Sequence, residues 1–433
     1  MRSELLLFYL LIGFNAVTLL IYISNPFESL SGNHTLTVFY ILLNLFCVAW
    51  GYRRGIAKGD YLKPPASKSF MSGINIRSIK FIFIFYLATF LLKYAYELHC
   101  PAFNIFALIN RIILGITNPY LGYTTGGSYR PFGWSLYVII SIVDGIFFII
   151  GMLCWKKLSK VQKSVFVLLS IIELFKGMGT GSSFGEIKMF TTLAIVVLSS
   201  IQSNYVGKKT IRRILLSIIV IALLAVIVFT HNMEGRAGGE FSSMTAEHFN
   251  FNKESFINKY FIMQFPERIQ NLYVYICHYL NNGYYNLEYI FNLNWDWTYF
   301  FGSNDAKSHL INVLGGVDIE PMNYQTKIFN TYGVDPYIYW HSCYVWVAND
   351  VSIFGVPIIL FWVGKFCSTA LVLYRRYNDL LSGVIFVIFA NMIIFLFANN
   401  NYIANLFYTF MFIFPVWIFT RYKKLYDTKT IID

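Results

Sequence analysis

The sequence predicts an all-α integral membrane protein with about ten transmembrane helices. Hydrophobic residues occupy 57% of the 433 positions and charged residues only 13%, whereas soluble domains have roughly 45–50% and 25%. The apolar residues form long blocks rather than amphipathic patterns, and a helix needs about 20 of them to cross the membrane hydrocarbon. Lys and Arg gather in short segments between these blocks. Together the three observations argue against a water-soluble fold.

Each long apolar block predicts one span. The fifth block is the weakest, because Glu173 and Lys176 interrupt it. Only Arg2 precedes the first block as a positive charge, and the residues after Ser24 do not form a small-residue cleavage site, so we expect a retained span rather than a cleaved signal. The apolar cores are Leu5–Ser24, Leu36–Trp50, Phe81–Tyr96, Ser135–Trp155, Val165–Met178, Met189–Ile201, Ile214–Thr230, Val351–Leu373, Leu381–Ala398 and Leu406–Thr420.

The positions of Lys and Arg predict the orientation, since short loops that stay in the cytoplasm keep positive charge. With the N-terminus inside, the basic clusters at 53–80, 156–163, 208–213, 375–376 and 421–429 all face the cytoplasm. Both termini are therefore expected in the cytoplasm (N-in/C-in). The predicted division is residues 1–230 for transmembrane helices one to seven, with basic cytoplasmic loops and a short periplasmic loop at 97–134; 231–345 for a large periplasmic loop; and 346–433 for helices eight to ten and a cytoplasmic tail.

The predicted large loop is too long for a plain connection and is rich in aromatic residues. It contains Trp295, Trp297 and Trp340 and a dense set of tyrosines between 273 and 289. Such a segment can bury surface, so we expect it to be partly helical, at or above the membrane interface. An interfacial aromatic belt would account for about half of these side chains.

Several function classes are disfavoured. The net charge of +12 comes from residues beside span ends, where they contact anionic lipid headgroups, so nucleic-acid binding is not expected. The six cysteines divide equally between spans and outer segments and form no Cys-x-x-Cys, so neither a metal site nor a disulfide framework is expected. No internal repeat is visible, which argues against transporters built from two related halves.

Arginines are scarce in the segments predicted to lie outside. They are Arg111 and Arg130 between spans three and four, Arg236 after span seven, and Arg268 in the large loop. A guanidinium group offers forked donors to phosphate oxygens, so these residues could hold a lipid-linked diphosphate. Each could instead be a surface or headgroup contact. Arg130 and Arg236 are the stronger candidates, because glycines flank them near span ends.

His341 lies among aromatic residues just before span eight. An imidazole with a pKa near neutrality can accept a proton from an attacking hydroxyl. The alternative is an interfacial histidine with satisfied hydrogen bonds. Asp350 would point about 180° away from His341 on a continuous helix, so we interpret Asp350 as the N-cap of span eight.

Two further features are interpreted as structural. Lys93, Asp144 and Glu173 are the main charges within the predicted spans, and three scattered charges predict no proton relay. The turn Gly179-Thr180-Gly181-Ser182-Ser183 has small residues that could approach an anion, but a tight turn between helices explains it without a function.

The assembled features resemble the Wzy-type O-antigen polymerase family. The resemblance covers most of the chain as topology: many spans, an arginine-bearing loop in the first half, and a dominant outer loop before the last three spans. A histidine followed by an aspartate and a glycine leads into the next span, here His341, Asp350 and Gly355. An Arg-x10-Gly pattern of some members matches Arg111 to Gly122. The chain departs from many relatives in lacking an arginine in the turn after span five.

The resemblance implies a metal-independent glycosyltransferase of lipopolysaccharide biosynthesis in the bacterial inner membrane. It would move the growing polysaccharide from undecaprenyl diphosphate onto the next lipid-linked repeat unit at the periplasmic face, without a cofactor. The expected partners are undecaprenyl-diphosphate-linked oligosaccharide, membrane lipids and a chain-length regulator protein. In this scheme His341, Arg130 and Arg236 are catalytic, while Arg111, Arg268, Trp295, Trp297 and Trp340 bind substrate, although core packing explains the tryptophans equally well.

Three alternatives remain open at the level of sequence. An O-antigen ligase shares the layout and would transfer the chain to lipid A core. A flippase or transporter of lipid-linked oligosaccharide would need a cavity along the spans and usually lacks so large a loop. A metal-dependent lipid-sugar glycosyltransferase would want paired carboxylates in the first outer loop, which offers only Glu28.

Overall fold

The computed structural model describes residues 3–28, 31–59, 76–101, 104–118, 131–179, 184–199, 250–336 and 339–398, residues 410 and 413–420, and single residues between 209 and 230. Its elements are helical, joined by loops. The main helices are α1 (Ser3–Ile23), α2 (His34–Gly59), α3 (Ile76–Glu97), α4 (Ile105–Thr117), α6 (Trp134–Leu153), α7 (Lys160–Gly179), α8 (Phe184–Ser199), α11 (Phe256–Tyr260), α12 (Glu267–Tyr289), α13 (Asp305–Gly315), α14 (Tyr324–Tyr332), α15 (Cys343–Tyr377) and α16 (Leu380–Ile394).

The described helices confirm the predicted all-α class. Four of them are long and apolar enough to cross a membrane, within Leu5–Ile23, His34–Ala57, Ser135–Leu153 and Cys343–Tyr377. Helices α3, α7, α8 and α16 also lie at predicted spans. The predicted seventh span falls largely outside the described residues, whereas the predicted tenth span is described, as helix, at residues 410 and 413–420.

Large apolar side chains point outward from the long helices. On α2, for example, Phe39 is 65% exposed and Phe46 is 63% exposed, and on α15 Ile358 is 62% exposed. Many exposed apolar side chains of this size are unfavourable in water but suit contact with lipid. The exposed faces therefore agree with a membrane protein.

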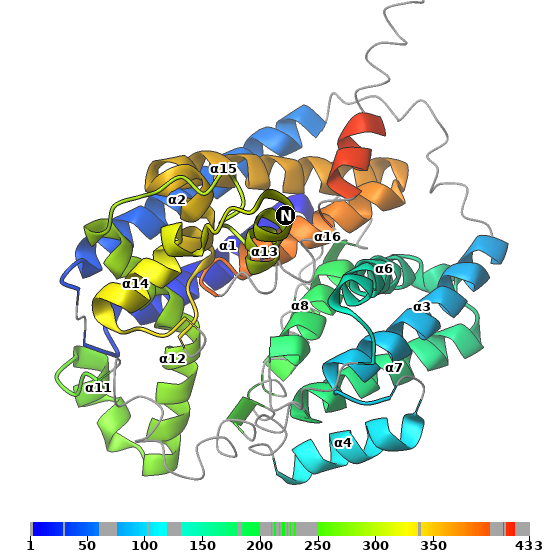
Figure 1. The fold of residues 1–433 in the computed structure, drawn as a ribbon, viewed down its shortest axis with the longest axis horizontal. Helices are drawn as coiled ribbons and strands as arrows, with labels where there is room; N and C mark the ends of the chain where they lie inside the picture. Colours follow the sequence, from blue (N-terminus) through cyan, green and yellow to red (C-terminus); the bar gives the residue numbers. More distant parts are fainter. Residues whose placement is uncertain are drawn as a thin grey trace, which may run out of the picture.

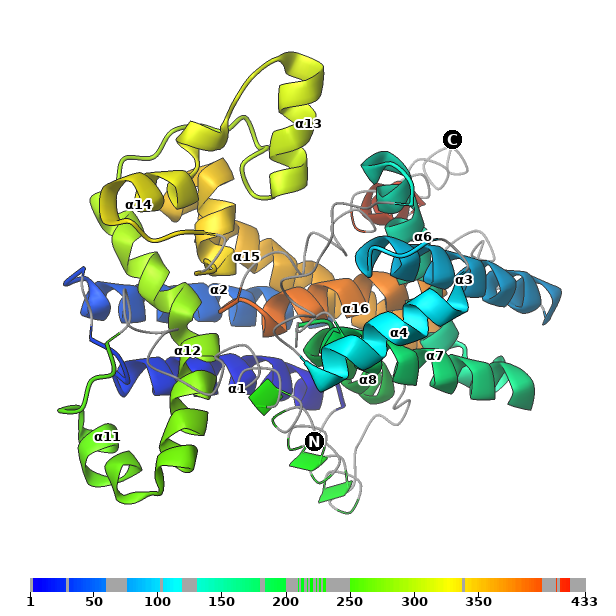
Figure 2. The same ribbon diagram turned by 60° about the horizontal axis from the view of Figure 1, so that its bottom comes forward.

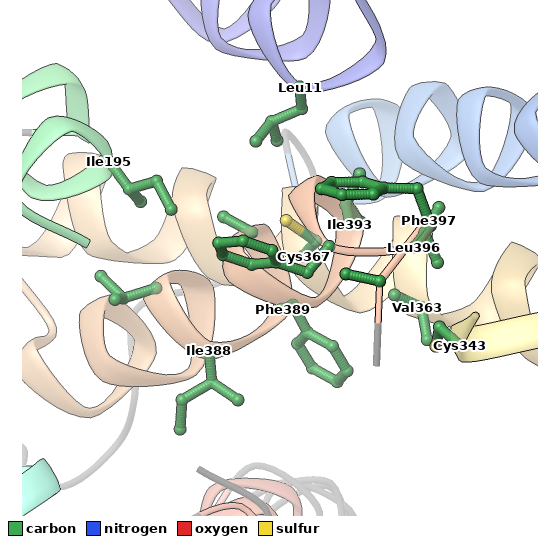
Figure 3. Close-up of a cluster of buried hydrophobic side chains, with 14 of the residues drawn as sticks. Leu11, Ile195, Cys343, Val363, Cys367, Ile388, Phe389, Ile393, Leu396 and Phe397 are labelled. Carbon is green, nitrogen blue, oxygen red and sulfur yellow. The ribbon is translucent and has the colours of Figure 1, made fainter. Parts of the chain in front are cut away.

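The helices form two neighbouring groups (Figure 1). One consists of α1, α2, α12, α15 and α16, and the other of α3, α4, α6, α7 and α8, with α6 and α8 also contacting α16. Apolar side chains from α1, α8, α15 and α16 meet in a shared core that includes Leu11, Ile195, Cys367 and Phe389 (Figure 3). The two groups are thus joined through α16.

Helices α2 and α15 make the most extensive helix pair, and glycines allow their close approach. A side chain at Gly51 would overlap the carbonyl group of Phe361, and one at Gly364 would overlap the carbonyl oxygen of Val48. Small residues at such positions let helix backbones pack tightly where the hydrophobic effect gives no driving force. This pair fastens the middle of α15 to α2.

The predicted large loop contains several helices, as its composition led us to expect. Helix α13 projects from one side of the bundle (Figure 2), while α12 packs against α1, α2 and α15. The second half of α12 is buried, although a segment lying only at or above the interface would remain exposed. Part of this segment is therefore integrated into the bundle itself.

Candidate functional site

Helix α12 is polar in composition yet buried in its second half. Asn281, Asn282, Asn286 and Glu288 are each at most 1% exposed. Buried polar side chains require hydrogen-bond partners, because leaving them unpaired costs free energy. The partners of this helix therefore show where polar chemistry is concentrated in the molecule.

His341 lies where the segment before α15 crosses α12. The carbonyl oxygen of Trp340 accepts a hydrogen bond from Nδ2 of Asn286 at 2.8 Å, and the Trp340 ring meets Tyr279 edge-on at a centroid distance of 4.3 Å. A side chain at Gly283 would overlap the backbone of Ser342, so this glycine permits the close crossing. His341 itself is 1% exposed.

The residues around His341 carry an unusual concentration of buried polar atoms that have no hydrogen-bond partner within the described part of the chain. They are Nδ2 of Asn282, Oδ1 of Asn286, Nε1 of Trp340, both ring nitrogens of His341, Oγ of Ser342, the hydroxyl of Tyr344 and Nε1 of Trp346. Most buried polar groups in proteins are paired, so a cluster of exceptions requires an explanation. We call this group the His341 cluster. Hydroxyl groups of a ligand could act as partners for such donors and acceptors.

Burial lowers the pKa of His341 to about 3. The imidazole is therefore neutral near pH 7, with one nitrogen able to donate and the other able to accept a hydrogen bond. A base with so low a pKa is weak, and general-base catalysis is most effective when the pKa lies near the working pH. An anionic group bound nearby would raise the pKa by stabilising the imidazolium form.

A second polar site, on the other side of α12, was not found from the sequence. The Glu288 carboxylate accepts hydrogen bonds from the hydroxyls of Tyr22 and Ser31. Nδ1 of His34 lies 3.3 Å from Glu288 Oε1, and the side chain of His34 is 24% exposed. An ionised Glu288 accepts a hydrogen bond from Nδ1–H of His34. The other ring nitrogen of His34, Nε2, is then a hydrogen-bond acceptor.

The two sites are connected through tyrosine rings that pack against one another. The ring of Tyr284 packs against Tyr22 at 5.5 Å and against Tyr344 at 6.3 Å, measured between centroids. Tyr22 contacts Glu288, and Tyr344 belongs to the His341 cluster. The only signals in the sequence were a lone glutamate in a tyrosine-rich helix and a histidine after Ser31-Gly32-Asn33, and neither indicated that the two would meet.

The structure brings together only some of the predicted site residues. Trp340 adjoins His341, whereas Arg111 lies on α4, where its Nε donates to the carbonyl oxygen of Leu98 at 3.4 Å. Arg268 is exposed in the first turn of α12, at the opposite end from the buried half. Arg130 and Arg236 lie outside the described residues.

Trp295 and Trp297 lie in the loop that packs against the beginning of α15. Nε1 of Trp295 donates to the carbonyl oxygen of Asn349 at 3.0 Å, and Trp297 packs against Tyr299 at 4.9 Å. Trp295 and Trp297 are 40% and 49% exposed. Their partly open faces are compatible with sugar stacking, although Trp295 also ties the loop to α15.

Asp350 is not the N-cap of span eight, contrary to the sequence interpretation. Helix α15 begins at Cys343 and continues through Asp350 to a break at Ser352, where φ is 60° and ψ is 171°. The Asp350 carboxylate accepts hydrogen bonds from Thr298 Oγ1 at 2.9 Å, Gly302 N at 2.7 Å and Lys307 Nζ at 3.1 Å. Its role is to fasten the 293–307 loop to α15.

The charges within the spans are not scattered as predicted. Nζ of Lys93 lies 3.0 Å from Oδ2 of Asp144 and pairs α3 with α6. Glu173 on α7 accepts a hydrogen bond from the Tyr94 hydroxyl at 2.7 Å. Helix packing therefore pairs these residues, and the two neighbouring contacts join α3 to α6 and to α7.

Comparison of the chain with known proteins found no relative. No family model, curated protein or solved structure matches the chain.

Proposed function

We propose that the chain is an O-antigen polymerase with about ten spans in the bacterial inner membrane, N-in/C-in, whose 231–345 segment faces the periplasm. The observation that carries the proposal is the His341 cluster, which lies where this predicted periplasmic segment meets α15. Polyhydroxylated sugars supply many donors and acceptors, and buried protein groups without partners would pair with them. The basic segments between the spans support the orientation.

The proposed reaction is glycosyl transfer from a lipid diphosphate. A hydroxyl of the incoming lipid-linked repeat unit attacks the anomeric carbon of the growing chain, the bond from that carbon to the phosphate oxygen breaks, and undecaprenyl diphosphate leaves. The proton of the attacking hydroxyl passes to a ring nitrogen of His341. Arg130 and Arg236, assigned from the sequence, stabilise the negative charge on the leaving diphosphate.

The low pKa of His341 fits this scheme when the substrate is bound. Binding of the diphosphate near the neutral imidazole would favour the protonated form and raise its pKa toward the working range. Substrate binding would thus make His341 a stronger base for the transfer reaction. The pair of His34 and Glu288 provides an alternative base, since the carboxylate orients the imidazole in the manner of a catalytic dyad.

The decisive experiment replaces single histidines in a strain that depends on this gene for its surface polysaccharide. We expect His341→Ala to reach the membrane in normal amounts and to leave lipid A core carrying single repeat units. His309→Ala is the matched control, because His309 is an exposed histidine on α13. His34→Ala distinguishes the two bases: loss of polymer only in this variant would move the proton acceptor to the Glu288 site.

The same strain separates the alternative functions. Loss of a polymerase leaves capped lipid with one repeat, loss of a flippase leaves no repeat on the outer face, and loss of a ligase leaves polymer on undecaprenyl diphosphate. Full-length polymer in all three variants, His341→Ala, Arg130→Ala and Arg236→Ala, would contradict the proposed roles. Mass analysis of the surface polysaccharide gives the readout.

A further inference from the structure

A cavity of about 700 Å³ opens between α6, α7, α8 and the junction of α15 with α16, together with the short 3₁₀ helix Trp155–Lys157. Its size lies within the range of roughly 300–1,000 Å³ that is typical of ligand pockets. None of the residues of the His341 cluster or the Glu288 site lines it. It is therefore a separate feature of the molecule.

The cavity has an apolar wall. The wall comes from α7 and α8, where Val167, Ile171, Leu193 and Val197 line the space and are each between 38% and 55% exposed. Covering side chains of this kind with an apolar group lowers the free energy, because it removes their surface from water. The wall therefore fits a hydrocarbon chain.

The rim of the same cavity is cationic. Lys156 and Lys157 contribute exposed ammonium groups, and Arg375 contributes its guanidinium. Arg375 is held in place, because its Nε donates to Ser199 O at 3.2 Å and its Nη2 donates to Leu198 O at 3.0 Å. The described residues that line the cavity include no aspartate or glutamate. The rim is therefore complementary to a phosphate.

We propose that this cavity binds an anionic phospholipid of the cytoplasmic leaflet. An acyl chain lies along α7 and α8, and the headgroup phosphate contacts Lys156, Lys157 and Arg375. In the predicted orientation these residues lie at the cytoplasmic ends of their helices, where anionic lipids face basic side chains. Trp155 also lies on the rim and is 38% exposed. Tryptophan is enriched at membrane interfaces. The proposal is independent of the transferase activity.

The test uses the full-length protein, purified and delipidated in detergent, with bound lipid counted by native mass spectrometry. We expect dioleoyl-phosphatidylglycerol to remain bound at least tenfold better than dioleoyl-phosphatidylcholine. The double variant Lys156→Gln/Lys157→Gln should lose this preference. The matched control is Arg53→Gln/Arg54→Gln, which removes two exposed charges from the end of α2, outside the cavity, and should retain it.

A second variant tests the apolar wall without changing the charge. Leu193→Trp fills the space beside α8 and should reduce phosphatidylglycerol binding at least tenfold while helix content, measured by circular dichroism, is unchanged. Three results would overturn the proposal: equal binding of the two lipids, equal loss in the control pair, or full displacement of the lipid by soluble glycerol phosphate. The last would show a site for phosphate alone.

Discussion

Nδ1 of His34 lies 3.3 Å from Oε1 of Glu288, although the two residues are 254 positions apart in the chain. Glu288 is 1% exposed, and Tyr22 and Ser31 also donate to its carboxylate. The connection between α1 and α2 is thereby fixed to the end of α12. This contact sets the position of the helix that supplies both polar sites.

Glu288→Gln should destabilise the protein. The amide NH₂ cannot accept the bonds that one carboxylate oxygen now accepts, so a buried hydroxyl or imidazole donor loses its partner. We expect the free energy of unfolding to fall by about 1–3 kcal/mol. Thermal unfolding in detergent measures the change. Glu254→Gln is the control, because this carboxylate is solvent-exposed beside Lys259 and its loss should leave the midpoint unchanged. Equal midpoints for both variants would contradict a structural role of Glu288.

Asp350→Asn should loosen the 293–307 loop. The substitution removes the ion pair with Lys307 and places an amide against donors such as Gly302 N. We expect a cost of about 2–3 kcal/mol, as for hydrogen bonds to a charged group that is largely buried. Hydrogen exchange across 293–308 should rise in this variant.

Asp296→Asn provides the comparison for that loop. Asp296 pairs with Lys327 at 2.8 Å, but its side chain is 58% exposed, and exposed pairs contribute at most about 1 kcal/mol. Exchange in this variant should stay close to that of the unmodified protein. If both variants exchange equally fast, the Asp350 contacts do not hold the loop.

Local patterns in the sequence predicted the helices because hydropathy is a property of each segment alone. The blocks that became α1, α2 and α6 could be identified without knowing their neighbours. The ordered character of the 250–336 region followed in the same way from its aromatic content. The start of α15 was missed, since His341 to Val351 is not a continuous apolar run.

Contacts between distant residues could not be predicted in this way. The pairing of Lys93 with Asp144 depends on the rotation of α3 against α6, and the pairing of His34 with Glu288 depends on how α12 enters the bundle. Neither quantity is encoded in residue spacing. Of the predicted site, His341 and Trp340 form a cluster with buried polar neighbours, whereas Arg111 and Arg268 lie elsewhere.

Lys93→Met should be severely destabilising, whereas the double variant Lys93→Met/Asp144→Leu should recover most of the loss. The single change leaves Asp144 charged and buried without its 3.0 Å partner, at a cost of about 3–5 kcal/mol. Replacing both charges by apolar side chains removes that penalty. The fraction of monodisperse protein on size-exclusion chromatography measures the outcome. A double variant that is no better than the single one would show that the fold needs the pair itself.

The stability of the protein should fall in acid because of His341. Its folded pKa, about 3 through burial, is below the unfolded value of about 6.5. Between these values the unfolded state binds the proton and the folded state does not, so stability is lost as the pH falls below about 6.5. From pH 7 to pH 5 the loss from this one residue should be about 2 kcal/mol.

His341→Asn removes this contribution, and the comparison must allow for His278. Burial lowers the pKa of His278 to about 4, so His278 adds a second contribution of the same sign over the same range. The single variant should therefore lose about half of the pH dependence that the two histidines produce. Unfolding midpoints at pH 7 and pH 5 give the measurement, and the exposed His309→Asn is the control. A variant with the full acid sensitivity of the unmodified protein would mean that His341 is protonated while the protein is folded, and the imidazole would then be a hydrogen-bond donor rather than a neutral base.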